Sequence, residues 1–180
     1  LLAICQSSDM HRATAANILY HIPEHDVTDK QRRDAKYVNF GMLFGLQADS
    51  LAKEHLHCPV WEAETLINSW WAGYPKVKKW TNERRLEALT TGEIVMTTGR
   101  KRRFRLILGE DSFHELNQAV NCDIQGTLGD YQKASRIELA PELQSLKSFM
   151  VVTCHDMIGF QVHKQFLGPA TRLIKEIMER

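Results

Sequence analysis

The stretch Thr28–Gly45, TDKQRRDAKYVNFGMLFG, decides how the rest of the chain is interpreted. Thr28 and Gln31 have the spacing of a capping box, in which two side chains satisfy the free N–H groups of the first helical turn. Gly45 predicts the end of this helix, because glycine adopts the left-handed conformation in which helices commonly terminate. The stretch therefore predicts one helix between Thr28 and Gly45.

Four side chains of this helix form a stripe of two cations followed by two aromatic rings. They stand four residues apart, so that each step overshoots a full turn by about 40°: Arg32, Lys36, Phe40 and Phe44. Cations are unfavourable near a helix N-terminus, and a bound polyanion would reverse that penalty. The stripe predicts a triphosphate at its start and a base or sugar against its rings. A solvated basic helix whose Phe residues face a core is the alternative that the spacing leaves open.

The same stretch resembles the fingers helix of family A (polymerase-I-like) DNA polymerases. The shared pattern is Arg-Arg-x-x-Lys-x-x-Asn-Phe-Gly-x-x-aromatic-Gly, here Arg32–Gly45. The resemblance implies that Arg32 and Lys36 bind the triphosphate of an incoming dNTP, with Lys36 as a catalytic general acid. It also implies that Phe40 packs on the deoxyribose, and that Phe44, where Tyr is usual, stacks in the nucleotide site. Arg33 is expected to contact DNA.

A second motif of this family precedes the helix. Asp9 is a good N-cap residue and predicts a helix over Met10–Tyr20. The segment Asp9-Met10-His11-x-x-Thr14-Ala15 resembles the family's Asp-Ile-His-x-x-Thr-Ala. The resemblance implies that His11 donates a hydrogen bond to the incoming triphosphate.

Three more helices are predicted between Gly45 and Gly92, near residues 49–57, 60–72 and 76–91. Apolar side chains of the second helix are expected in the core: Trp61, Leu66, Ile67, Trp70 and Trp71. The basic residues of the third helix, among them Arg84 and Arg85, predict a solvated face, with contact to DNA as the alternative.

Residues 93–107 predict a β-hairpin with a strongly basic second strand. Five of the six residues from Arg100 to Arg105 are basic, and like charges at this density favour an external polyanion. Thr98–Arg102 resembles the basic hairpin of the family, which implies that Arg100 and Arg102 contact DNA. Contacts to phosphates carry no sequence information.

Residues 112–140 predict a long helix with an irregularity near residues 122–126 and an end at Pro141. Its Asn-x-x-Ile-Gln-Gly-Thr-x-x-Asp segment, Asn121–Asp130, resembles a further family motif. The resemblance implies that Asn121 and Gln125 bind DNA in the minor groove, where every base pair offers acceptors. Asn117 stands where the family commonly has Arg, so this position does not supply the cationic contact that the family makes there.

Two apolar, β-rich segments, residues 149–154 and 158–162, predict a hairpin with His155-Asp156 at its tip. The tip resembles the family's His-Asp-Glu, which implies that His155 contacts DNA and that Asp156 is a catalytic metal ligand. Met157 replaces the usual Glu. Residues 169–180 predict a closing amphipathic helix whose inward positions are Leu173, Ile174 and Ile177.

Together these segments predict an α+β fold, with a mainly helical fingers subdomain (1–92) packed on part of an antiparallel palm sheet, the distal palm (93–180). The resemblance implies template-dependent transfer of nucleotides from dNTPs to a primer 3′-OH, with two Mg²⁺ ions as cofactors. The family's second metal aspartate is not found, so we interpret the chain as a polymerase fragment that is inactive alone. Its expected partners are primer-template DNA, dNTPs and the remainder of the polymerase polypeptide, in DNA replication or repair.

Composition leaves few other classes open. A net charge of +1 with 43% hydrophobic and 25% charged residues is ordinary for a soluble globular protein. No apolar run approaches the roughly 20 residues that span a bilayer, so no membrane partner is expected. Scattered cysteines indicate a reducing, cytoplasm-like compartment. The family resemblance implies that this is the cytoplasm of a bacterial or phage-infected cell. A single-subunit RNA polymerase-like enzyme and a non-catalytic nucleic-acid-binding remnant remain as alternatives.

Overall fold

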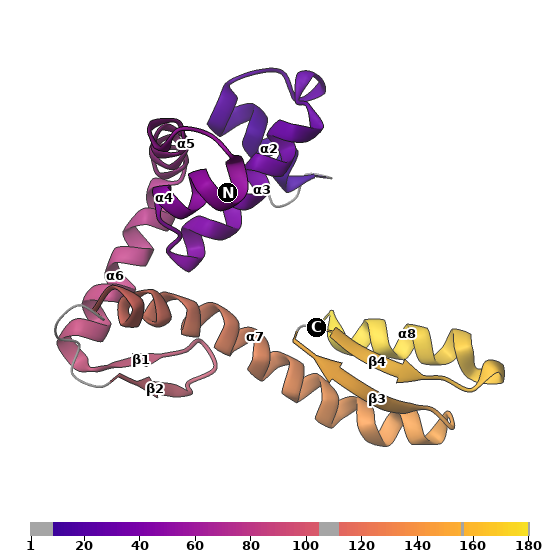
Figure 1. Cartoon of the computed structure of the whole chain (residues 1–180). Helices are drawn as coiled ribbons and strands as arrows, with labels where there is room; N and C mark the ends of the chain where they lie inside the picture. The colour runs from indigo at the N-terminus through magenta and orange to yellow at the C-terminus, as the bar shows by residue number, and fades with distance from the viewer. Residues whose placement is uncertain (1–8, 105–111, 156, 180) are drawn as a thin grey trace. The chain divides into compact units, whose positions relative to one another are not determined.

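The computed structural model describes residues 9–104, 112–155 and 157–179 (Figure 1). Helices dominate, and two two-stranded sheets, β1-β2 and β3-β4, accompany them. The predicted α+β class is confirmed. The chain divides into two compact units: Leu1–Ile94 with Arg103–Asn121, and Val95–Arg102 with Cys122–Arg180.

The first unit is a cluster of short and medium helices. In chain order they are α2 Met10–Thr14, the π-helical η1 Ala15–Tyr20, the 3₁₀ turn η2 Glu24–Asp26, α3 Asp29–Phe44, α4 Ala48–Ser50, the π-helical η3 Leu51–Leu56, α5 Val60–Gly73 and α6 Pro75–Thr91. The predicted helices near 10–20, 28–45, 49–57, 60–72 and 76–91 are therefore confirmed.

Helix α3 begins and ends where its sequence predicts. The Gln31 N–H donates to Thr28 Oγ1 at 3.2 Å, and the Thr28 N–H donates to Gln31 Oε1 at 2.9 Å. Gly45 closes the helix at φ 75°, a left-handed conformation that glycine tolerates best. A Cβ atom on Gly41 would lie 2.7 Å from Leu46 Cδ2, so glycine at this position lets Leu46 fold back onto the helix.

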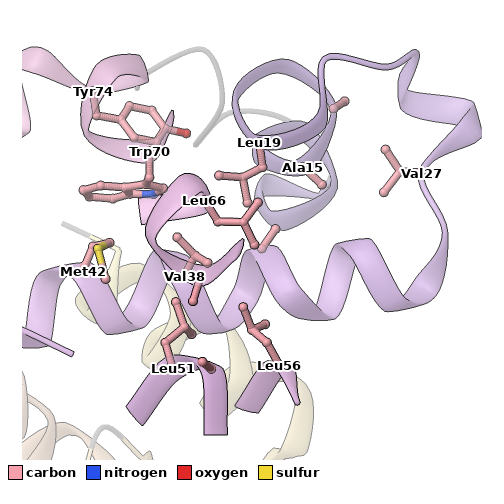
Figure 2. Close-up of a cluster of buried hydrophobic side chains, with 14 residues drawn as sticks. Ala15, Leu19, Val27, Val38, Met42, Leu51, Leu56, Leu66, Trp70 and Tyr74 are labelled. Atoms are coloured by element: carbon pink, nitrogen blue, oxygen red, sulfur yellow. The ribbon is translucent and has the colours of Figure 1, made fainter. Parts of the chain in front are cut away.

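The core of the first unit gathers buried side chains from helices far apart in sequence (Figure 2). Val38 of α3 is fully buried, as is Leu51 of η3, and Trp70 of α5 is 3% exposed. The prediction that Trp61 belongs to this core is wrong, since it is 67% exposed. The buried stripe of α5 is Ala63, Leu66 and Trp70; Trp61, two residues before Ala63, points to the opposite face.

Two elements cross between the units. The hairpin consists of β1 Glu93–Val95 and β2 Lys101–Arg103, and its last predicted residues lie outside the described ones. Helix α7, Ser112–Ser145, is the longest element. It runs without interruption through residues 122–126, so the predicted irregularity is wrong.

The predicted end of α7 at Pro141 is also wrong, because the helix continues to Ser145. Leu139 and Leu143, on either side of the proline, are buried against Ala170 and Ile177 of α8. Burial of two leucines stabilises by about 1.5–3 kcal/mol each. It therefore offsets the roughly 3 kcal/mol that an interior proline costs.

The second unit ends with a hairpin and a helix that lie along the C-terminal part of α7 (Figure 1). The elements are β3 Phe149–Cys154, β4 Met157–Gln161, the 3₁₀ turn η4 Lys164–Phe166 and α8 Leu167–Met178. The strands pair antiparallel, with Cys154 opposite Met157 and a bulge between Met150 and Val152. The predicted hairpin and closing helix are confirmed: Ile177 is buried, while Leu173 and Ile174 pack on the same cluster. Asp156 lies outside the described residues.

In the part of the chain that the structure describes, no helix is both long enough and apolar enough to traverse a bilayer.

Candidate nucleotide and nucleic-acid site

Helix α3 presents the predicted stripe outward. Its buried residues, including Ala35, Val38 and Met42, face the core. Phe40 and Phe44 are 48% and 41% exposed. The alternative in which these two rings fill the core is therefore wrong, because the core takes the other side of the helix. An exposed pair of aromatic rings is instead available to a ligand.

Asp9 holds the first cation of the stripe in place. Its Oδ1 accepts hydrogen bonds from the backbone N–H groups of His11 and Arg12, both at 3.1 Å, and so caps α2. Its Oδ2 accepts Arg32 Nε–H at 2.5 Å. The hydrogen bond from Arg32 and those from the two N–H groups hold the pKa of Asp9 below its ordinary value, against the opposing effect of burial. Asp9 therefore orients the guanidinium of Arg32 through Nε, and among the described residues no contact is made by the two Nη groups of Arg32, which can face another anion.

His11 lies beside both the cations and the aromatic rings of the stripe. Its ring centroid is 5.6 Å from that of Phe40, and its Nδ1 is 3.1 Å from Asn39 Nδ2. Burial lowers the pKa of His11, and the charges of Arg32 and Lys36 lower it further, while Asp9 opposes them. The lowered pKa favours the neutral form of His11 at pH 7. We call His11, Arg32 and Lys36 the phosphate patch.

A pocket of about 520 Å³ opens beside the two phenylalanines, a size typical of small-ligand sites (roughly 300–1,000 Å³). Aromatic side chains of α3 line one part of it, and amide side chains of α7 line another; those named are Tyr37, Phe40, Phe44, Asn117, Gln118 and Asn121. Asn121 Oδ1 is buried without a hydrogen-bond partner among the described residues. Rings together with an unsatisfied amide match the needs of a base, which offers a π-face and polar edges.

Arg85 is a candidate residue that the sequence analysis missed. Its Nη2 donates to Asn117 Oδ1 at 2.8 Å, and it lines a neighbouring pocket with Gln47 and Trp71. Burial lowers the pKa of Arg85, so the prediction that it lies on a solvated face is wrong. A guanidinium thus stands beside Asn117, the position where a family arginine is lacking. Nothing in the sequence indicates this pairing, since the two residues are 32 positions apart on different helices.

In the second unit, two of the predicted motifs contact each other. Asp130 Oδ2 accepts Thr98 Oγ1–H and Arg100 Nε–H, both at 2.8 Å. A Cβ atom on Gly126 would lie 2.6 Å from Met96 Sδ, so glycine allows the hairpin to approach α7. The hydrogen bond from Thr98 and the contact with Arg100 lower the pKa of Asp130. Part of the positive charge of the hairpin is therefore compensated within the chain, by Asp130.

The remaining predicted DNA contacts are exposed. They are Arg33 on α3, Arg102 on β2, Gln125 on α7 and His155 in the β3–β4 turn. His155 has a left-handed φ of 51°. Within residues 9–104, 112–155 and 157–179, no group of three or more His, Cys, Asp or Glu side chains could hold a metal ion. These residues do not form the predicted Mg²⁺ site by themselves, and its proposed ligand Asp156 is not among them.

Comparison with known proteins identifies the family. The sequence model described as DNA polymerase family A matches residues 1–180. The chain belongs to DNA polymerase family A. This confirms the family predicted from the motifs and decides against the single-subunit RNA polymerases.

Curated relatives of this family A chain include bacterial DNA polymerases. It is 31% identical over 177 residues to the thermostable DNA polymerase I of Thermus aquaticus. The aligned region covers 97% of this chain and 21% of the relative. The chain is 32% identical over 183 residues to DNA polymerase I of Deinococcus radiodurans, covering 98% of this chain and 19% of the relative. The chain thus spans about a fifth of the length of these relatives.

A solved structure shares the fold. The POL domain of Pol1 from M. smegmatis, in complex with DNA primer-template and dNTP, matches with a TM-score of 0.83 and 24% sequence identity. The match covers 94% of this chain and 30% of that one.

Proposed function

We propose that this chain is the fingers and distal palm of a DNA-directed DNA polymerase, with residues 1–92 as fingers and 93–180 as distal palm. The observation that carries the proposal is the phosphate patch at the start of an exposed aromatic stripe. Family membership supports it, as does the fold shared with a polymerase domain whose complex holds primer-template and dNTP.

In this proposal the residues of the first unit bind the nucleotide. Arg32, oriented by Asp9, and Lys36 pair with phosphate oxygens, since Arg and Lys form strong charge-assisted hydrogen bonds with phosphate. His11 donates a further hydrogen bond. Phe40 packs on the deoxyribose and Phe44 stacks near the base. Lys36 gives a proton to the departing pyrophosphate as a general acid.

The DNA contacts are assigned to side chains that suit the grooves and the backbone. Asn121 and Gln125, one turn apart on α7, bind minor-groove edges without reading sequence. Arg33, Arg100, Arg102 and His155 contact the strands. For Arg100, the contact uses N–H groups that Asp130 and Gly126 leave available.

Two Mg²⁺ ions complete the proposal, with Asp156 as their one ligand in this chain. When bound, they would activate the primer 3′-OH and neutralise the triphosphate. The described residues offer no metal group of their own. We therefore propose that the 180-residue chain alone does not synthesise DNA. Incorporation of a labelled dNTP at normal rates by the purified chain would refute this.

Nucleotide binding tests the proposal directly. Each charge-assisted hydrogen bond is worth about 1.5–3 kcal/mol, so Arg32→Ala should raise the Kd for a dNTP roughly 10- to 100-fold. The matched control is Lys53→Ala, which also removes one exposed cation from the first unit but lies on η3. Fluorescence titration of the whole chain with a labelled dNTP measures both. Equal Kd values for Arg32→Ala and Lys53→Ala would contradict the proposal, and a preference for rNTPs would point to RNA synthesis.

A non-catalytic nucleic-acid-binding remnant is the second candidate. The observation that favours it is Met157, which replaces the Glu of the family motif and lies at the start of β4 with 57% of its surface exposed. Supplying the rest of the polymerase polypeptide in trans separates the two candidates. Templated synthesis in the mixture supports the enzyme, and DNA binding without synthesis supports the remnant.

A further inference from the structure

Asn39 lies at the centre of a buried hydrogen-bond network behind the phosphate patch. Its Oδ1 accepts Trp70 Nε1–H at 2.8 Å. Its Nδ2 is 3.1 Å from His11 Nδ1 and 3.2 Å from Thr14 Oγ1. Asn39 is 8% exposed and Trp70 is 3% exposed, so water does not substitute for these bonds.

Trp70 determines which way the Asn39 amide faces. An indole N–H can only donate, so the atom it contacts must be the amide oxygen. The opposite orientation would place the amide NH₂ group against the indole N–H, two donors facing each other, and leave the buried Trp70 N–H without an acceptor. A buried unsatisfied group costs about 1–3 kcal/mol. The amino group of Asn39 therefore faces His11 and Thr14.

The Thr14 hydroxyl oxygen accepts the second hydrogen of the Asn39 amino group. The Thr14 hydroxyl donates to Met10 O at 2.9 Å. Having only one hydrogen, it accepts from Asn39 Nδ2 and from Tyr74 OH, the latter at 3.0 Å. Trp70 and Tyr74 lie next to each other at the C-terminal end of α5, where Tyr74 is the C-cap residue (Figure 2), and their ring centroids are 4.9 Å apart. Both amide hydrogens and the amide oxygen of Asn39 are thus satisfied.

The orientation of the Asn39 amide determines the tautomer of His11. An amino group only donates, so His11 Nδ1 must accept and cannot carry a proton. A neutral imidazole with no proton on Nδ1 has it on Nε2, and an imidazolium would put a proton on both nitrogens. We propose that Asn39, oriented by Trp70, is a positioning residue that holds His11 as the neutral Nε2–H tautomer. On the proposed function, on which this last step rests, that N–H is the donor offered to the triphosphate.

The charges around His11 act in the same direction. Burial disfavours an imidazolium most, and Arg32 and Lys36 on α3 disfavour it further, while among the described residues Asp9 of the α2 cap favours it. A bound triphosphate would by itself draw a second proton onto a free histidine. The Asn39 amino group opposes that protonation, because it occupies Nδ1.

The tautomer can be measured without nucleotide or activity. In the whole chain labelled with ¹⁵N-histidine, the chemical shifts of Nδ1 and Nε2 distinguish the two tautomers and the imidazolium. The His11→Gln variant assigns the His11 signals among the eight histidines. At pH 7.5 we expect a protonated Nε2 and a bare Nδ1. A protonated Nδ1, or an even mixture, would overturn the assignment.

Two variants test the cause. Asn39→Asp places an acceptor where the amino group was, so the proton should move to Nδ1 or the ring should become charged. Trp70→Phe removes the donor that orients the amide and should give a mixture of tautomers. The control is Trp71→Phe, since Trp71 packs edge-on against Trp70 at 4.8 Å and makes no hydrogen bond with Asn39; it should leave the Nε2–H tautomer unchanged.

The spectra of these variants can overturn the proposed role of Asn39. An unchanged tautomer in folded Asn39→Asp, or identical spectra for Trp70→Phe and Trp71→Phe, would overturn the role of Asn39. If circular dichroism shows that Asn39→Asp is unfolded, the role of Asn39 is tested instead by the ¹⁵N-histidine spectra of the wild-type chain, Trp70→Phe and Trp71→Phe. A dNTP titration then serves as a separate arm. Failure of dNTP to shift the Nε2 signal of an intact tautomer counts against the proposed function and not against this assignment.

Discussion

At the scale of single residues, several side chains near the phosphate patch each contribute both to the fold and to the candidate site. Asp9 caps α2 through one oxygen and fixes Arg32 through the other. Asn39 joins α3 to α2 through His11 and to α5 through Trp70. Gly41 and Gly45 each leave room for a neighbouring side chain. These shared roles make a substitution at one position affect both the fold and the site.

Asp9→Asn should lower stability in a pH-dependent way. The folded state lowers the pKa of Asp9 below 3.8, so its charge stabilises the fold above pH 3.8, and this contribution is lost as pH falls through the folded-state pKa. Because the Arg32 side chain is 41% exposed, screening limits the loss to about 0–1 kcal/mol at pH 7. Asn retains the cap. Urea unfolding at pH 7 and pH 3 measures the difference, which should be smaller at pH 3 than at pH 7; an equal difference at both would contradict the assignment.

Lys36→Ala tests the general-acid role. In an enzyme assembled from this chain and the rest of the polymerase polypeptide, we expect nucleotide incorporation to slow by roughly 10²–10⁴-fold. DNA binding should weaken much less, because Lys36 is assigned to the triphosphate and not to the strands. Single-turnover kinetics and DNA titration measure the two effects. Similar losses in both would argue against the role.

At the scale of elements, glycine positions on two helices differ in what surrounds them. Gly45 ends α3 in the left-handed region, and a Cβ there would lie 2.2 Å from Asn117 Nδ2. Gly129 lies inside α7, and a Cβ there would meet nothing within 4 Å. Glycine is therefore required at position 45, both by the left-handed backbone and by the nearby Asn117. Neither reason applies at position 129.

Gly45→Ala and Gly129→Ala should therefore change stability in opposite directions. The left-handed conformation costs an alanine about 1–2 kcal/mol, and the contact with Asn117 adds to this loss. In the interior of α7, alanine should instead stabilise by about 0.5–1 kcal/mol. Thermal and urea unfolding of both variants measure these effects. If Gly45→Ala instead stabilised the chain, this would contradict the left-handed conformation of Gly45 at the end of α3.

At the scale of the whole molecule, the β3–β4 hairpin carries uncovered apolar surface. Four large side chains on these strands are more than half exposed: Phe149, Val151, Val152 and Met157. A two-stranded sheet is marginal by itself, and open edges invite pairing with other chains. On the proposed function, the remainder of the polymerase polypeptide would cover this surface.

The purified chain should consequently self-associate as its concentration rises. Val151→Lys should weaken this association, because a charge on the strand opposes edge-to-edge pairing. Leu128→Lys is the control, since Leu128 is 56% exposed but lies on α7. Sedimentation velocity over a range of concentrations measures both variants. A wild-type chain that stays monomeric, or equal effects of the two lysines, would contradict the prediction.

The sequence alone determined the family, the start and end of α3, the helix boundaries at Asp9 and Gly92, both hairpins and the stripe of two cations and two aromatic rings; the structure decided that the rings face outward. These features depend on residues within a few positions of one another, through caps, glycine conformation and hydrophobic period. Tertiary structure decided the exposure of Trp61, the continuation of α7 past Pro141, the pairing of Arg85 with Asn117 and the network around Asn39. Each of these depends on which distant side chain packs alongside. Trp70 reaches Asn39 across 31 positions, and no local pattern records a hydrogen bond of that span.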